Sequence, residues 1–132
     1  MDESLEQPLA VLLADHNQDS RSSFRDAIAR AGIEVATASS SRAAIAAARS
    51  LAPRVIIWAI GMPGFTETSA VQSFRADPAF RETTLIALSG RPSAGDERDL
   101  RDAGFDCVLS RPVAPDVILA CVREALGAKL SA

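Results

Sequence analysis

The sequence predicts an α/β fold in which helices cover both faces of a parallel sheet. Short apolar runs alternate five times with segments whose apolar residues recur at helical spacing. This alternation is typical of βαβ units with right-handed crossovers. The run at Val55–Ile60 is apolar on both faces and is followed by glycine and proline, as expected of a buried parallel strand. At 132 residues the chain fits one domain.

The first strand is expected at Val11–Ala14, and a helix follows it. The apolar residues of this helix share one face: Phe24, Ala27, Ile28 and Ala31. Asp19 or Ser20 can cap the helix with a side-chain oxygen, and Gly32 can end it. A short second strand is expected at Ile33–Ala38.

Ser39–Ser41 offers caps for an alanine-rich second helix, which should end before Pro53. The third strand is the apolar run at Val55–Ile60. A weaker third helix is expected at Thr68–Ala76, with Pro78 just beyond it. Two of its residues are expected to face inward: Val71 and Phe74.

The fourth strand, Leu85–Leu88, precedes a mostly charged helix at Asp96–Ala103 that Gly104 can close. The main anchors of this helix are expected to be Leu100 and Ala103. The fifth strand is expected at Cys107–Leu109. The last helix begins near Pro115, which suits a first helical turn because no N–H is needed there.

The last helix carries the clearest apolar stripe: Ile118, Cys121, Val122, Ala125 and Leu126. Gly127 is expected to end it. The predicted organisation is therefore a flexible N-terminus at 1–8, one domain at 9–127 and a tail at 128–132. No output domain is expected, so a signal would leave through the surface of this domain.

The composition limits the classes of function. A net charge of −3 gives no basic face for nucleic acid, and no apolar stretch approaches the roughly 20 residues that span a bilayer. The acidic start lacks the pattern of a secretory signal, so a cytoplasmic location is expected. The two cysteines, Cys107 and Cys121, are interpreted as reduced thiols, with a disulfide as the less favoured reading.

Polar or turn-forming residues follow four of the strands. They are Asp15-His16-Asn17, Gly61-Met62-Pro63-Gly64, Ser89-Gly90 and Ser110-Arg111-Pro112. In open α/β sheets, ligands bind beyond such strand ends. From about Leu9 to Leu126 this organisation resembles the receiver domain of two-component response regulators. The resemblance implies a flavodoxin-like (CheY-like) doubly wound sheet of five parallel strands in the order 2-1-3-4-5, with five helices.

In that family the first strand ends in an acidic pair and the third in a phospho-accepting aspartate, while the fourth ends in Ser or Thr and the fifth in Lys-Pro. Three positions of this chain match: Asp15, Ser89 and Pro112. Three positions of the pocket depart: His16 for the second acid, Ala59 for the phospho-acceptor and Arg111 for the lysine. The family's aromatic switch position holds Val108, which has no ring to relocate. The chain therefore resembles a degenerate receiver, or pseudo-receiver.

The departures change the expected chemistry. An acyl phosphate cannot form on the methyl group of Ala59, and magnesium usually takes one or two carboxylates, of which only Asp15 remains. We therefore expect no catalytic residue, no enzyme activity, no cofactor, and lost or very weak magnesium binding. Asp15 could still be a turn residue or a residual metal ligand, and the lone His16 is more often a solvated side chain.

Arg111 is expected to reach toward Asp15 across the space beside Ala59, since its planar fork suits a carboxylate. The alternative is that Arg111 points into solvent. Because the family has a cis peptide bond after its lysine, the bond between Arg111 and Pro112 is expected to be cis as well.

The resulting hypothesis is a stand-alone receiver-like signalling module in a two-component phosphorelay system, independent of phosphorylation and acting through protein contacts. Its partner would be a protein such as a histidine kinase or another regulator, with no nucleic acid and no membrane; homodimer formation stays open. The weak surface candidates are Arg98, Arg101 and Arg123, with Val108. The alternative is a conventional regulator whose native aspartate is replaced by Ala59, by nature or by engineering. A small enzyme or nucleotide binder is disfavoured because no Gly-x-Gly-x-x-Gly follows the first strand.

Overall fold

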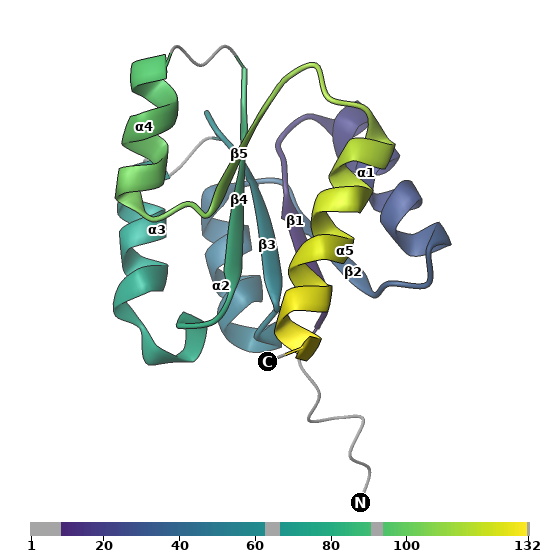
Figure 1. Ribbon diagram of the computed structural model, residues 1–132, viewed down its shortest axis with the longest axis horizontal. Coiled ribbons are helices and arrows are strands. Elements are labelled where there is room, and N and C mark those ends of the chain that lie inside the picture. Colours follow the sequence, from purple (N-terminus) through teal and green to yellow (C-terminus); the bar gives the residue numbers. More distant parts are fainter. Residues whose placement is uncertain (1–8, 63–66, 91–93, 132) are drawn as a thin grey trace, which may run out of the picture.

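Five parallel strands form one sheet in the order β2-β1-β3-β4-β5, as predicted (Figure 1). This computed structural model describes residues 9–62, 67–90 and 94–131. The strands are β1 (Val11–Ala14), β2 (Val35–Ala38), β3 (Val55–Ala59), β4 (Thr84–Ser89) and β5 (Cys107–Ser110). Every strand runs the same way, so their carboxyl ends meet at one edge of the sheet.

Helices cover both faces of the sheet. They are α1 (Gln18–Arg30), α2 (Ser41–Leu51), α3 (Glu67–Ala76), α4 (Ala94–Ala103) and α5 (Pro115–Ser131). Helices α1 and α5 pack together on one face, and α2, α3 and α4 lie on the other (Figure 1). Among the described residues, no helix is long and apolar enough to cross a bilayer.

The core lies around the three central strands, because β1 and β3 are buried along their whole length and β4 from its second residue. The inward residues predicted for α3, Val71 and Phe74, are both buried. The ring of Phe74 contacts Trp58 edge-on at a centroid distance of 5.9 Å, and Phe80 packs against Phe74 at 5.0 Å. This aromatic cluster fills the space beneath α3.

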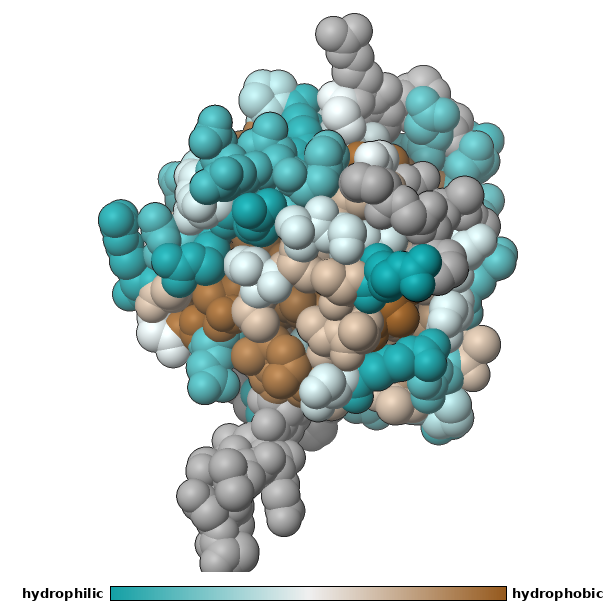
Figure 2. All heavy atoms as spheres, turned by 180° about the vertical axis from the view of Figure 1, so that it is seen from behind, coloured by the Kyte–Doolittle hydropathy of each residue, from teal (hydrophilic) through white to brown (hydrophobic). Residues whose placement is uncertain are grey.

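Seen from behind, the face of the molecule where α2 lies has hydrophobic residues (brown) at its centre and hydrophilic residues (teal) around them (Figure 2). Helix α2 buries Ala44 and Ala48 completely, because small side chains let its backbone approach the sheet closely. The predicted cap is confirmed, since the Ser40 side chain accepts a hydrogen bond from the Ala43 N–H.

The ends of two helices differ from the prediction. The N-cap of α1 is Asn17, whose side chain accepts from the Ser20 N–H, so Asp19 and Ser20 lie inside the first turn. Helix α5 does not end at Gly127 but continues to Ser131. A glycine inside a helix costs only about 1 kcal/mol relative to alanine, and good helix formers follow it here.

The remaining differences are small. Strand β2 begins at Val35 rather than Ile33, and β3 ends at Ala59 rather than Ile60. A short 3₁₀ helix, η2 (Pro78–Phe80), was not predicted; its Asp77 cap accepts from the Ala79 N–H. The predicted tail at 128–132 is helical as far as residue 131, and the predicted N-terminus at 1–8 lies outside the described residues.

Candidate functional site

Asp15 follows β1 at the carboxyl edge of the sheet, and its side chain is completely buried. Its Oδ1 atom accepts a hydrogen bond from the Asn17 N–H at 3.0 Å, and its Oδ2 atom accepts one from the Ser20 hydroxyl at 2.5 Å. Because a buried charge is costly unless it is paired and hydrogen-bonded, these partners account for how Asp15 is tolerated there.

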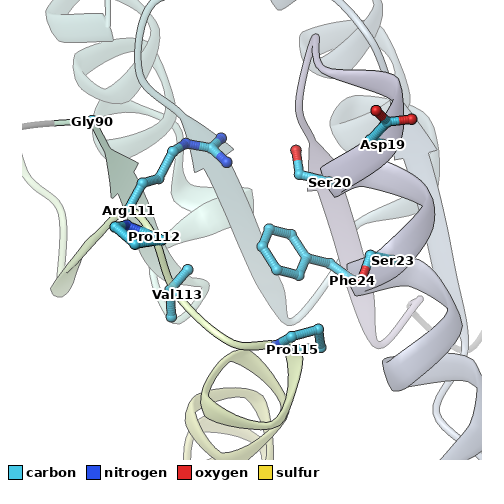
Figure 3. A pocket seen from close by; sticks show the side chains of 9 residues that line it. All are labelled: Asp19, Ser20, Ser23, Phe24, Gly90, Arg111, Pro112, Val113 and Pro115. Atoms are coloured by element: carbon cyan, nitrogen blue, oxygen red, sulfur yellow. The ribbon is translucent and has the colours of Figure 1, made fainter.

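Arg111, just beyond β5, supplies the opposite charge. Its Nη2 atom lies 3.3 Å from Asp15 Oδ2, and its side chain is 27% exposed. The backbone N–H of Arg111 donates to the carbonyl of Ser89 at 2.8 Å, which fixes the start of the side chain. Figure 3 shows the guanidinium extending from the end of β5 toward Ser20 on α1. The predicted approach of Arg111 to Asp15 is therefore confirmed.

The peptide bond between Arg111 and Pro112 is cis, as predicted from the resemblance. Pro112 itself is exposed, and its ring lines a groove beside the ion pair. The resemblance thus holds for the backbone at this strand end, although the side chain before the proline is arginine.

Ala59 is the last residue of β3 and is completely buried. It lies in register with Leu88 of β4, and the chain turns after it through Gly61, whose φ is 97°. Since positive φ values favour glycine, this turn explains the glycine at that position. A methyl group at the centre of the sheet edge offers neither a nucleophile nor a metal ligand. Pro63 and Gly64 of the predicted turn lie outside the described residues.

Three predicted residues remain, one at the surface beside Asp15 and two in the strands. His16 is 47% exposed, with its Nδ1 atom 4.0 Å from Asp15 Oδ1, so it borders the carboxylate at the surface. Ser89 is buried at the end of β4. Val108 is half-buried in β5, in register with Ala87.

The three surface arginines lie away from this pocket. Arg98 and Arg101 are exposed on α4, and Arg123 is exposed on α5. Arg101 is engaged locally, because its Nη2 atom lies 3.2 Å from a carboxylate oxygen of Glu97, one helical turn earlier. The structure therefore keeps these cations on the surface and brings none of them to the carboxyl edge of the sheet.

Two residues of the site were missed by sequence reasoning. Ser20 was interpreted only as a possible cap, yet its hydroxyl binds the Asp15 carboxylate. Arg21 donates from Nη1 to the backbone carbonyl of Asp15 at 3.0 Å. The signal that could have found both is their position in the first turn of the helix that Asn17 caps, which lies directly over the end of β1.

The residues present do not match the donor set of a magnesium site. Magnesium prefers hard oxygen ligands, usually carboxylates with waters. Here one carboxylate remains, and both of its oxygens already have protein partners. Within the described part of the chain, no group of three or more His, Cys, Asp or Glu side chains is placed to hold a metal ion.

An open groove of about 610 Å³ runs beside the ion pair, between α1 and the segment that leads into α5 (Figure 3). Phe24 lines the groove on the α1 side, with Val113 and Pro115 opposite. Arg111 and Ser20 line its end nearest the sheet. The pair is thus reachable from solvent on the arginine side only, since Asp15 is completely buried.

Comparisons with known proteins agree with this arrangement. A sequence profile of the response regulator receiver domain matches residues 11–123. The chain is 24% identical over 120 residues to the polar-differentiation response regulator DivK of Brucella anthropi, covering 91% of this chain and 98% of the relative. DivK of Brucella ovis is 25% identical over 118 residues, covering 89% and 96%.

Solved structures show the same fold. The chemotaxis response regulator CheY4 of Vibrio cholerae superposes with a TM-score of 0.83 at 25% identity, covering 90% of this chain and 99% of that chain. The receiver domain of the Francisella response regulator 1452 gives a TM-score of 0.85 at 21% identity, covering 93% and 99%.

Proposed function

Because this chain belongs to the family of response regulator receiver domains, we propose that it is a degenerate receiver, a signalling module that acts without accepting a phosphoryl group. Its output would be contact with other proteins. Ala59 supports this proposal, since the third strand ends in a residue without a nucleophile.

The observation that carries the proposal is the ion pair between Arg111 and Asp15. In a receiver that binds magnesium, an acidic residue at the end of the first strand is free to hold the metal. Here the guanidinium and the Ser20 hydroxyl already bind the one remaining acid. A cation would have to displace a partner that is attached to the same chain.

The proposal includes several properties of the protein. It has no enzyme activity, it needs no cofactor, and its affinity for magnesium is absent or very weak. It works in the cytoplasm with a protein partner such as a histidine kinase or another regulator, and two copies could pair. Arg98 is exposed on α4 and Arg123 on α5, so charge reversal at these two residues is the first test of those helices as contact surfaces.

Phosphorylation with labelled acetyl phosphate and magnesium tests the proposal. Ala59→Asp alone is expected to take up no label, because Arg111 and His16 still oppose a metal site. The triple variant His16→Asp, Ala59→Asp, Arg111→Lys is expected to be labelled. Ala59→Asn is the matched control, since it adds a side chain of similar size with no nucleophile.

The second candidate is a conventional phospho-accepting regulator in which Ala59 stands for a native aspartate. The persistence of Asp15, Ser89 and Pro112 at the expected strand ends favours it. Ready labelling of the single Ala59→Asp protein would establish this candidate and overturn the degenerate receiver.

A further inference from the structure

The two cysteines of the chain lie side by side, although they belong to different elements. Cys107 opens β5 and Cys121 lies in the middle of α5. Both thiols are free and partly exposed, and Cys121 lies close enough to Cys107 to raise the pKa of its thiol. Both also line one groove of about 200 Å³, together with Glu124 and Ala125 of α5.

Regular elements rather than loops hold both thiols in place. Strand β5 is the edge of the sheet, and Cys107 pairs there with Ile86 of β4. Helix α5 buries Ile118 and Val122 against the core. Cys121 belongs to the same apolar stripe but is partly exposed, and it lines the groove with Thr84 and Ile86 of β4. The groove lets a small oxidant or reductant reach the pair from solvent.

We propose that Cys107 and Cys121 form a redox modification site, at which a hydroperoxide converts the two thiols to an intramolecular disulfide. In the first step, one sulfur attacks hydrogen peroxide, an S–O bond forms as the O–O bond breaks, and water leaves. In the second step, the other sulfur attacks the sulfenic sulfur, an S–S bond forms, and the second water leaves. The thiols lose two electrons and two protons in total, and a small thiol reverses the change by exchange.

The surroundings of Cys107 affect the rate of this reaction through the pKa of its thiol. Burial raises the pKa of the Cys107 thiol, the neighbouring Cys121 raises it further, and Arg101 acts in the opposite direction. Because the thiolate is the reactive form, oxidation is expected to be slow at neutral pH and to accelerate as the solution becomes alkaline. Such a site responds to sustained peroxide rather than to a brief pulse.

The disulfide would close a loop that contains Arg111 and Pro112. Cross-linking a loop restricts the unfolded chain, so the oxidised protein is expected to melt at a higher temperature than the reduced one. The link would also tie the start of β5 to α5, which restrains the segment that carries the guanidinium. This inference does not depend on whether the chain accepts a phosphoryl group.

Intact-mass spectrometry of the folded, full-length protein tests the inference. After hydrogen peroxide and then iodoacetamide, the monomer is expected to lose the mass of two hydrogen atoms and to bind no alkyl group. Dithiothreitol should restore two alkylation sites. Peptide mapping of the wild-type protein should find Cys107 joined to Cys121, which needs no variant to fold.

The single variants Cys107→Ser and Cys121→Ser are the matched controls. Each should keep one thiol that is driven to sulfinic acid or to a covalent dimer, without the intramolecular loss of mass. Two alkylatable thiols surviving in peroxide-treated wild-type monomer would overturn the inference. So would oxidised wild-type protein that runs mainly as a covalent dimer on a non-reducing gel.

Discussion

At the scale of single residues, the structure of the pocket depends above all on the partners of one buried carboxylate. Asp15 is bound by a backbone N–H, a hydroxyl and a guanidinium, all from its own chain. Each partner satisfies a lone pair that would otherwise be buried without a hydrogen bond. Removing any of them should therefore be measurable in the stability of the folded protein.

Arg111→Ala is expected to lower the free energy of unfolding by about 1–3 kcal/mol, because it leaves a buried carboxylate short of a partner. Urea unfolding followed by Trp58 fluorescence measures this. Arg123→Ala, which removes an exposed arginine on α5, should change stability by less than about 0.5 kcal/mol. Equal effects of the two variants would show that the ion pair does not contribute.

Ser20→Ala should cost about 1–2 kcal/mol, since the hydroxyl is a direct donor to Asp15. The double variant with Arg111→Ala should deviate from additivity, because both side chains bind the same oxygen atom. Ser23→Ala, in the next turn of α1, is the control. Strict additivity of Ser20 and Arg111 in a double-mutant cycle would argue against a shared carboxylate.

The thiol of Cys107 should be a slow target for alkylation. Its pKa is raised above the usual value for a thiol, first by burial, so its rate with iodoacetamide should still be rising at pH values where an ordinary thiol is already ionised. Mass spectrometry of the Cys121→Ser variant isolates this thiol and removes a neighbour that also raises the pKa of Cys107. The alkylation curve of that variant should therefore shift to lower pH, and an unchanged curve would contradict the contact.

At the scale of elements, Arg75 links α3 to neighbouring segments of the sheet. Arg75 donates to the carbonyl of Gly104 from Nε and to the carbonyl of Thr83 from Nη1, both at 3.0 Å. Its Nη2 atom lies 2.6 Å from Asp106 Oδ2, and Asp106 in turn accepts from the Leu85 N–H. These contacts join α3 to the starts of β4 and β5.

Arg75→Met should therefore destabilise the protein by about 1–3 kcal/mol, since it keeps the apolar stem but removes three hydrogen bonds. Arg25→Met is the matched control, because Arg25 pairs only at the surface with its neighbour Asp26. Thermal or urea unfolding of both variants measures the two losses of stability. A similar loss in the two proteins would mean that the element contacts of Arg75 are not what stabilises it.

How far the sequence predicts these elements depends on how local the cause is. Apolar runs predict the strands because burial on both faces leaves a direct pattern, and Val71 and Phe74 follow from helical spacing. The end of α5 was wrong because a glycine stops a helix only when the next residues also leave it. The network of Arg75 was not predicted, since it joins segments that are distant in sequence.

In the pocket, too, some features could be predicted from the sequence and others could not. The residues at the strand ends could be named from the sequence, and the contact of Arg111 with Asp15 followed from the resemblance combined with the shape of a guanidinium. The role of Ser20 could not be found that way. Its hydroxyl reaches the carboxylate only because Asn17 begins the helix where it does.

At the scale of the whole molecule, the sheet, the helices and the ion pair form a unit that should not respond to divalent cations. Trp58 is buried one residue before Ala59, so its fluorescence reports on the carboxyl edge of the sheet. A receiver that binds magnesium is stabilised by it, because a ligand of the native state alone raises stability by mass action. This gives a test with two independent readouts.

Millimolar magnesium should leave both the Trp58 emission and the melting temperature of the protein unchanged. Calcium at the same concentration controls for general effects of divalent salt. The triple variant with Asp at 16 and 59 and Lys at 111 should respond to magnesium in both readouts. A saturable rise in the melting temperature of the wild-type protein would overturn the proposed loss of the metal site.

The arginine beside Asp15 also bears on how such a protein could be controlled in a cell. A protein that is switched by phosphorylation changes its activity while its concentration stays constant. Because the counter-charge of Asp15 is part of the chain, the proposed degenerate receiver needs no phosphate, and in its reduced form the occupied fraction of a partner would depend on the concentration of this protein relative to the dissociation constant. The rates of synthesis and degradation would then control the response, as a kinase and a phosphatase do for a phosphorylated regulator. The response would last as long as the protein does.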